Sequence, residues 1–418
     1  MNYILGRHLG FCFAKKFQDF ISVGLRGARR TLLLTILALF SYCTALGREE
    51  EKESATQTTF PVRVLLDQTE ENSSFSWTLS SAKGFKIEDV NNATTVEDIK
   101  DCKIIITLKK GKIAINGRRL SVRQARIIAQ EGYIKYNDLE YAGDMLITWH
   151  EKMIYLINSV DLEDYIFSVV RWEGWPGWPL EVNKVFAIMC RTYVVNKVLI
   201  ERRKKKIFDI KNSNIHQTYK GIHAADHLRQ ALAETRGVVM TYKGVPIEAM
   251  YDASCGGVVP ALLDGVNFNG APYLKRTYAC PYCKKTKVYS WQVEYTRSSL
   301  EEILKNYLEL PISIIDISVS KRDKAGVVQE LLMRAKSGTY VLPAKKVYAL
   351  FKYVKSLCFD VVKKGKRFIF KGRGYGHHLG ICQWGVRQMV KEGWTYLEIL
   401  NFYYLGISFM NIQVVEGA

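Results

Sequence analysis

The sequence lacks internal repeats, and beyond one apolar run near its start it has no second hydrophobic span. The first absence excludes a repeat array, and the second excludes a protein that crosses a membrane several times. The glycine-dense stretch Gly372–Gly385 also lacks the Lys-Ser/Thr ending of a phosphate loop, which argues against nucleotide binding there. The class that remains is a large globular protein.

Cysteine is present in a number that excludes a complete disulfide framework. Of the nine cysteines, Cys12 and Cys43 lie in the leader, which leaves seven. An odd number of thiols cannot all pair within one chain. Cys190 and Cys358 lie in apolar patterns typical of core positions, so we expect both to be packing residues.

Composition is ordinary, but the charge is not. The chain has 418 residues, of which 48% are hydrophobic and 24% charged, as in a globular protein with more than one core. The formal net charge is +19. A surface of this sign favours polyanionic partners: nucleic acid, an anionic membrane or an acidic cell-wall polymer.

The start of the chain argues against nucleic acid. Arg26, Arg29 and Arg30 precede the apolar run 31–46, which is followed by small and then charged residues. This pattern is typical of an export signal, with a retained membrane anchor as the alternative, and we assign residues 1–47 to it. The predicted location is the cell envelope, either periplasmic or at the outer face of the cytoplasmic membrane. An anionic wall or membrane surface is therefore the expected charged partner.

The remainder predicts an α+β fold. Residues 48–59 read as a linker, 60–158 as a β-rich domain, and 159–418 as a mixed α/β catalytic core on which that domain packs, with a long surface groove. A helix is expected near Val122–Gln130. Short β-branched runs predict strands at 62–66, 104–108, 113–115, 145–149 and 154–157.

Two helices are predicted after the β-rich domain. Asp161 suits an N-cap, and Gly174 should end the first helix. Pro179 then suits the first turn of the second helix. Apolar residues recur there at helical spacing and predict a buried stripe: Val182, Val185, Phe186, Met189 and Tyr193.

Glu173 is the candidate catalytic residue. It ends the first predicted helix in a loop with Trp172, Trp175 and Trp178, which would shield the carboxyl group from water. Glycosidases usually need two carboxylates, and no second acid stands in this loop. Lytic cleavage of peptidoglycan needs only one, because the sugar's own 6-hydroxyl displaces the leaving group. The alternative is a solvated helix-terminal glutamate beside core tryptophans.

Several ordered motifs resemble the stage II sporulation protein D (SpoIID) family over residues 60–410. They are Leu162-Glu-Asp-Tyr165, Glu173, Cys190-Arg-Thr-Tyr193, Gln217-Thr-Tyr-Lys-Gly221, Thr235-Arg-Gly237, Ser254-Cys-Gly-Gly257, Gly372-Arg-Gly-Tyr-Gly-His377 and Gln383-Trp-Gly385. The resemblance implies a lytic transglycosylase that cuts peptidoglycan glycan strands already stripped of stem peptides. It also implies a functional partner, the N-acetylmuramoyl-L-alanine amidase that removes those peptides. It implies that Glu173 is the catalytic acid and base.

The same resemblance implies a substrate groove. Arg191 is expected to line it, either pairing with Glu173 or binding a substrate oxygen, with a helix-surface charge as the alternative. One wall is expected from Tyr251, Ser254, Gly256 and Gly257, and the opposite wall from Gly374, Gly376, His377 and Gln383. The predicted substrate-binding residues also include Tyr193, Tyr375 and Trp384. His378 stands where the family pattern has glycine.

No cofactor is required by this chemistry, but a structural zinc ion is one interpretation of the cysteines. Cys280 and Cys283 have the spacing of a zinc knuckle, and Cys255 would be a third ligand. Some members of the resembled family bind zinc near this region. Asp252 stands where many of them have histidine, so the fourth ligand is open. A disulfide or free thiols are the alternatives.

Two other functions fit parts of the sequence. A non-catalytic glycan-binding protein that stimulates an amidase would keep the groove without using Glu173. A cysteine hydrolase would use Cys255 with His377, supported only by the presence of those two residue types. His223 and His227 have ligand spacing, but we expect a surface pair.

Overall fold

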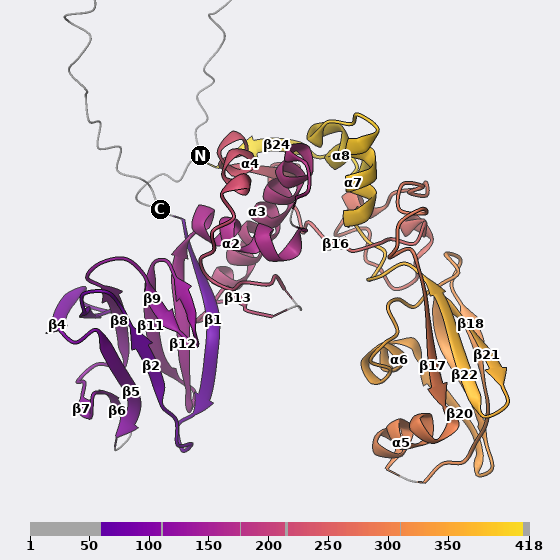
Figure 1. The fold of residues 1–418 in the computed structure, drawn as a ribbon, viewed down its shortest axis with the longest axis horizontal. Helices are drawn as coiled ribbons and strands as arrows, with labels where there is room; N and C mark the ends of the chain where they lie inside the picture. The colour runs from indigo at the N-terminus through magenta and orange to yellow at the C-terminus, as the bar shows by residue number, and fades with distance from the viewer. Residues whose placement is uncertain (1–59, 110–111, 176, 214–215, 310, 413–418) are drawn as a thin grey trace, which may run out of the picture. The chain divides into compact units, whose positions relative to one another are not determined.

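The computed structural model describes residues 60–109, 112–175, 177–213, 216–309 and 311–412 (Figure 1). The export signal or anchor (1–47) and the linker (48–59) lie outside these residues. In the described part of the chain, no helix is both long and apolar enough to span a bilayer.

The N-terminal region is built from short strands. In chain order they are β1 (Pro61–Glu70), β2 (Trp77–Ser80), β3 (Phe85–Asp89), β4 (Thr94–Ile99), β5 (Lys103–Lys109), β6 (Lys112–Ile115), β7 (Arg118–Arg119), β8 (Gln124–Ala129), β9 (Ile134–Tyr136), β10 (Leu139–Tyr141), β11 (Asp144–His150) and β12 (Met153–Asp161). With β13 (Ile210–Lys211) they form a sheet in the order β13-β1-β12-β11-β8-β3-β4 and a second sheet in the order β10-β9-β2-β5-β6-β7. The predicted β-rich region is confirmed.

The helix expected near Val122–Gln130 is wrong. This segment forms β8, which pairs with β3 on one side and β11 on the other. Ala125 and Ile127 are fully buried while their neighbours are partly exposed. That period of two is the strand signature, and six residues offer too little length for a helical period to compete with it.

Two helices follow directly from β12. They are α2 (Leu162–Glu173) and α3 (Leu180–Arg203). Asp161 caps α2 by accepting a hydrogen bond from Glu163 N–H, as predicted. Pro179 is the N-cap of α3 rather than a residue of its first turn. Side chains from β1, β12, α2 and α3 share one hydrophobic core. The α+β class is therefore confirmed, with the β-rich region packed on the helices.

α3 is the central helix of the core. Every residue from Val185 to Val195 is buried, so the helix is covered on all sides, as expected for a helix without a polar face. Its neighbours include α4 (Arg229–Glu234), β14 (Val238–Tyr242), β15 (Val245–Pro246), α7 (Gln383–Lys391) and α8 (Tyr396–Tyr403). Two further elements contact these neighbours or α2: η1 (Asp226–Leu228) and β24 (Ser408–Asn411). β24 pairs with β14, so the end of the described chain closes the core.

A second hydrophobic core lies within the 159–418 segment. It comprises β17 (Ser290–Thr296), α5 (Arg297–Leu308), β18 (Ile314–Arg322), β19 (Val328–Ala335), β20 (Gly338–Pro343), α6 (Ala344–Leu350), β21 (Phe359–Lys364) and β22 (Arg367–Arg373). Buried Phe351, Phe368 and Phe370 contribute about 1.5–3 kcal/mol each. β17 and β22 pair antiparallel from end to end, with Ser290 opposite Arg373. The chain therefore leaves and re-enters at one place, which brings the cysteine knuckle and the glycine-rich stretch together.

Candidate active site and cysteine cluster

Glu173 is held at the C-terminal end of α2. The helix ends where Gly174 N–H donates to the Val170 carbonyl oxygen. The Glu173 Oε1 atom accepts a hydrogen bond of 2.6 Å from Thr218 N–H, and its backbone carbonyl accepts one of 3.2 Å from Gln383 Nε2. Segments far apart in the sequence thus fix both the side chain and the main chain of Glu173. A carboxylate oxygen held by a backbone N–H keeps a defined orientation.

The Glu173 side chain lines a cavity of about 230 Å³. The other lining residues are Tyr193, His216, Thr218, Met250, Tyr251 and His377. Glu173 is the only carboxylate among these described lining residues. The carboxyl group therefore faces a small chamber lined by aromatic and imidazole side chains. It is neither fully solvated nor enclosed in the protein interior.

Two tyrosines form one side of this chamber. The rings of Tyr193 and Tyr251 meet edge to face, with centroids 6.5 Å apart. Burial, and secondarily the charge of Glu173, raises the pKa of Tyr251 well above its usual range. The hydroxyl therefore stays protonated near neutral pH. It is buried and makes no hydrogen bond of ordinary geometry in the described part of the protein, although it lies beside the Glu173 carboxylate, so a bound ligand can accept from it.

Two histidines join this chamber to its neighbours. His216 also lines a cavity of about 620 Å³, and His377 also lines one of about 340 Å³. His377 Nδ1 accepts from Leu379 N–H at 3.1 Å, so Nε2 carries the hydrogen of the neutral ring. The surrounding protein lowers the pKa of His377, although its ring keeps solvent access. The site therefore extends from the Glu173 chamber to two adjoining cavities.

Arg191 does not line the groove, contrary to the expectation from the motifs. It is fully buried, and its guanidinium pairs with both oxygens of Glu163, not with Glu173. A third bond goes from Arg191 Nη1 to the Val238 carbonyl oxygen. Arg191 therefore joins α3 to α2 and β14. Neither predicted role, substrate contact or exposed helix charge, matches this position.

The two glycine motifs are bonded to each other instead of standing as opposite walls. Ser254 and Tyr375 exchange backbone hydrogen bonds of 3.2 and 2.7 Å. Gly256 has a φ of +60°, and a Cβ there would lie 2.8 Å from Gly374 N. Only glycine fits this contact. Beside it, Gly257 has a φ of +70°. Both motifs therefore form one wall.

The predicted contact residues of that wall differ in their access to solvent. Ser254 is fully buried and Gln383 nearly so, whereas the Tyr375 ring is 41% exposed. Lys355 Nζ lies 4.7 Å from the Tyr375 ring centre. Of these three residues, Tyr375 is the one whose side chain can contact a polymer. The Gln383 side chain instead donates to the backbone carbonyl oxygen of Glu173.

His378 adopts the conformation expected of the glycine that it replaces. Its φ is +69°, a left-handed value that is uncommon outside glycine. Asp252 Oδ2 accepts from His378 N–H at 2.8 Å, and His378 Nδ1 lies 2.9 Å from the Cys255 carbonyl oxygen. These bonds hold the strained turn. Asp252 is thus a partner of His378 and not a member of the cysteine cluster.

The four tryptophans nearest Glu173 in the motifs, Trp172, Trp175, Trp178 and Trp384, form a buried pair and an exposed pair. Trp178 and Trp384 are 8% exposed, with ring centres 5.8 Å apart in an edge-on arrangement. Trp172 and Trp175 are 40% and 48% exposed. Lys287 Nζ lies 5.0 Å from the Trp175 ring centre. The packed pair supports the loop after Glu173, and the exposed rings are available to stack on sugar faces.

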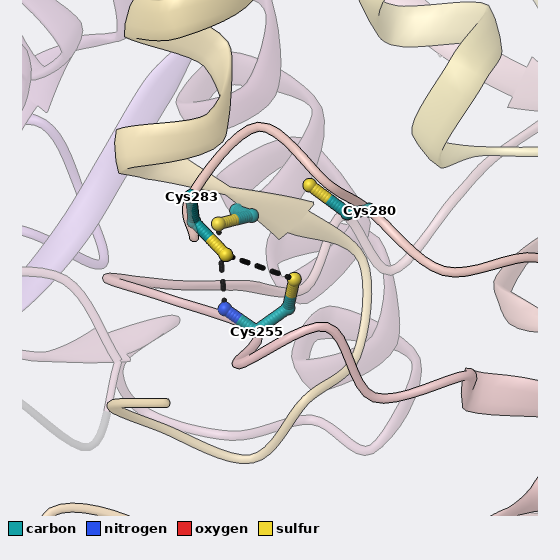
Figure 2. Close-up of side chains that lie close together, drawn as sticks. Cys255, Cys280 and Cys283 are labelled. Atoms are coloured by element: carbon teal, nitrogen blue, oxygen red, sulfur yellow. Dashed lines mark hydrogen bonds between the residues drawn. The ribbon is translucent and has the colours of Figure 1, made fainter. Parts of the chain in front are cut away.

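Four cysteines form a buried cluster. The Sγ atoms of Cys255, Cys280, Cys283 and Cys382 all lie within 4.8 Å of one another, and Figure 2 shows Cys255, Cys280 and Cys283 directed toward one another. The Cys255 and Cys283 Sγ atoms are 3.7 Å apart. A tetrahedral zinc ion with Zn–S bonds of about 2.3 Å requires sulfur separations of about 3.8 Å. The four residues therefore fit a zinc ion.

The cluster links three parts of the chain. Cys255 follows β16 (Tyr251–Asp252), Cys382 ends β23 (Ile381–Cys382), and β16 pairs parallel with β23. Hydrogen bonding, first from Cys255, lowers the pKa of the Cys283 thiol, which favours the thiolate that a metal needs. Four protein ligands would leave no open position, so the site is suited to structure and not to catalysis.

Sequence reasoning missed several members of this site. Cys382 lies within the glycine-rich stretch and is not among the predicted metal ligands, although it contributes the fourth sulfur of the cluster. Thr218 contributes through its backbone, which no residue-type pattern can reveal. His216 adjoins the Gln217–Gly221 motif and Met250 adjoins the predicted contact residue Tyr251, and that adjacency is the available signal. Glu163, the partner of Arg191, lies inside a matched motif as well.

Family models match two separate parts of the chain, and Tyr251, Cys255 and Cys382 lie outside both matches. Residues 150–242 match the family model described as Stage II sporulation protein, and residues 276–380 match a domain of unknown function, DUF8618. The first match includes Glu173, Arg191 and Thr218. The second contains the inserted β17–β22 unit and two cluster cysteines.

Three relatives extend the likeness. An uncharacterized protein of Brachyspira hyodysenteriae is 29% identical over 69% of this chain and 76% of its own length. Stage II sporulation protein D of Bacillus subtilis is 24% identical over 60% of this chain and 74% of its own length. The amidase enhancer of Bacillus subtilis is 24% identical over 55% of this chain but only 38% of its own length.

Proposed function

The chain belongs to the SpoIID family, and from that premise we propose that it is a peptidoglycan lytic transglycosylase of the cell envelope. Family membership and the likeness to an amidase enhancer support a role at the cell wall. The observation that carries the catalytic proposal is the chamber in which Glu173 is the only carboxylate among the described lining residues. A reaction in which one carboxyl group acts first as acid and then as base fits that chamber better than a reaction that needs two carboxyl groups.

The proposed proton path follows from the hydrogen bond to Thr218. Because Glu173 Oε1 accepts the Thr218 N–H, Oε2 is the oxygen that carries the acidic proton. It protonates the glycosidic oxygen as the bond from C1 of N-acetylmuramic acid to N-acetylglucosamine breaks. The 6-hydroxyl oxygen attacks C1, and its proton passes to the Glu173 carboxylate. The products are a 1,6-anhydro end and a free hydroxyl, with no water consumed.

The neighbouring groups suit the binding of that sugar. Tyr251 offers a protonated hydroxyl beside Glu173, and neutral His377 offers Nε2–H. Exposed Trp172, Trp175 and Tyr375 give flat apolar faces for pyranose rings. Sugar rings commonly pack on such faces while their hydroxyls meet polar groups.

A zinc ion held by Cys255, Cys280, Cys283 and Cys382 would supply structural stability and no electrophile. It would join β16, β23 and the segment with Cys280 and Cys283 that precedes β17. No step of the reaction depends on it. Thiols committed to a metal also leave the hydrolase that uses Cys255 and His377 without its nucleophile.

The test uses purified chain and glycan strands freed of stem peptides by an amidase. Mass spectrometry should find 1,6-anhydro ends with the wild-type chain and none with Glu173→Gln. Glu140→Gln, an exposed carboxylate outside the chamber, is the matched control and should retain full activity. Anhydro ends formed equally by Glu173→Gln would disprove the proposal.

A second candidate is favoured by the likeness to the amidase enhancer. In this alternative the groove binds glycan and stimulates an amidase without cutting the strand. Amidase stimulation that survives Glu173→Gln, together with an absence of anhydro ends from the wild-type chain, would establish it. The same assays therefore separate the two functions.

A further inference from the structure

The Glu173 chamber adjoins a larger cavity rich in lysine. His216 lines both, and the second cavity has a volume of about 620 Å³. Its basic lining residues are Lys197, Lys204, Lys205, Lys206 and Lys211. The sequence alone suggests that the run Lys204–Lys206 is a solvated helix exit, and the structure places all three residues, still exposed, among the lining residues of this cavity.

Two of the three acids that line this lysine cavity are already paired with basic side chains. Asp209 accepts from Arg63 at 2.6 Å and lies 3.4 Å from Arg202. Glu201 pairs with Lys204 at 2.8 Å. The third acid, Glu151, lies 3.6 Å from His150, so a single carboxylate is left to offset the remaining lysines.

Three exposed lysines of this cavity form no ion pair with a carboxylate in the described part of the chain. They are Lys205 and Lys206, just after α3, and Lys211, in β13. The only other interaction of the Lys211 ammonium group in this region is with the Phe208 ring, whose centre is 6.0 Å away. A cavity with uncommitted ammonium groups favours an anionic ligand.

His216 connects this charge to the catalytic chamber. Its Nδ1 accepts from Lys211 N–H at 3.0 Å, so the neutral ring carries its hydrogen on Nε2. Burial, and then the charges of Lys197 and Lys211, lowers the pKa of His216. The imidazole is therefore neutral at pH 7 and stands as a hydrogen-bond donor between the two cavities.

We propose that the lysine cavity binds the lactyl carboxylates of stem-free glycan, so that Lys206 and Lys211 select strands already processed by an amidase. In intact peptidoglycan this carboxyl group is a neutral amide joined to the stem peptide. Hydrolysis of that amide converts it to an anion and also removes the bulk of the peptide. The cavity therefore distinguishes the two states by charge. The inference rests on the proposed function, because it assumes that the polymer in the chamber is glycan.

The test measures binding in the Glu173→Gln background, so that no strand is consumed. One probe is end-labelled stem-free glycan, and the other is the same glycan with its lactyl carboxylates converted to amides. Fluorescence anisotropy should give a roughly tenfold lower Kd for the carboxylate form, as two partly exposed charge pairs allow. Lys206→Ala/Lys211→Ala should bring the ratio of the two Kd values close to one.

Two double variants serve as controls. Lys364→Ala/Lys366→Ala removes the same charge from exposed positions at the β21–β22 turn, and Lys206→Arg/Lys211→Arg keeps the charge in the cavity. Both should keep the tenfold preference. A ratio near one in the parent protein would overturn the inference, as would a preference that persists in Lys206→Ala/Lys211→Ala. Displacement of glycan by polyglutamate at equal carboxylate concentration would also overturn it, because the cavity would then accept any polyanion.

Activity separates this inference from the proposed function. Wild-type chain that releases anhydro ends equally fast from both glycans would overturn the carboxylate site and leave the transglycosylase standing. A tenfold binding preference without anhydro ends would support the site and remove the catalytic assignment.

Discussion

The guanidinium of Arg191 donates two hydrogen bonds to the carboxylate of Glu163, of 2.8 Å from Nε and 2.6 Å from Nη2. The pair joins α3 to α2, and Arg191 has no exposed surface. Glu163 Oε1 also accepts from Gly237 N–H at 3.1 Å. The motif that contains Arg191 is therefore structural at this position, and it supports the helix that carries Glu173.

Arg191→Met should destabilise the protein without removing a substrate contact. Breaking a buried ion pair leaves a carboxylate without its partner, at a cost of about 3 kcal/mol. Urea unfolding should detect this loss, while glycan cleavage per folded molecule stays close to wild type. Unchanged stability together with lost activity would return Arg191 to the substrate site.

Tyr251→Phe should lower activity while leaving stability unchanged or slightly raised. The buried Tyr251 hydroxyl makes no hydrogen bond of ordinary geometry in the described protein, so its removal relieves an unmet polar group. If it donates to the sugar, cleavage should fall by about 10- to 100-fold, since a hydrogen bond in a dry site contributes roughly 1.5–3 kcal/mol. Thermal unfolding and the rate of anhydro-end formation check both parts. Tyr193→Phe provides the comparison within the same chamber.

One zinc ion per chain should be found by plasma mass spectrometry of protein purified without chelator. Cys382→Ser should lose that metal and lower the unfolding temperature, because the fourth sulfur completes the tetrahedron. Cys358→Ser, a buried cysteine outside the cluster, should retain the metal. Full metal content in Cys382→Ser would show that Cys382 is not a ligand.

Stability should fall as the pH drops below about 6.5, in part because of His223. Burial lowers the pKa of His223 from its ordinary value of 6.5. The unfolded chain therefore takes up a proton first as the pH falls, so the contribution of His223 is complete above 6.5 and is lost below it. Its ring nitrogens are engaged with the Phe167 carbonyl oxygen and Ala225 N–H. His223→Gln should flatten the pH dependence of urea unfolding. An unchanged slope would contradict this assignment.

Helices and strands could be predicted from the sequence where interactions between neighbouring residues determine them. Asp161 predicted a cap, and the β-branched runs around Ile104 and Ile154 predicted strands, because N-capping and the period of two depend on neighbouring residues. The segment at Val122 failed for the same reason. Its apolar spacing suits either element, and only pairing with β3 and β11 decided between them.

Only some residues of the candidate site could be predicted from the sequence. The sequence by itself determined the α+β class, the candidate acid at the end of a capped helix and three of the four sulfurs, since each depends on residue type and near spacing. Only the tertiary structure decided that Arg191 pairs with Glu163, that Thr218 orients Glu173 through a backbone N–H, and that Cys382 completes the cluster. Those contacts join residues 28, 45 and 127 positions apart. Over such separations, chain folding and not local preference brings groups together.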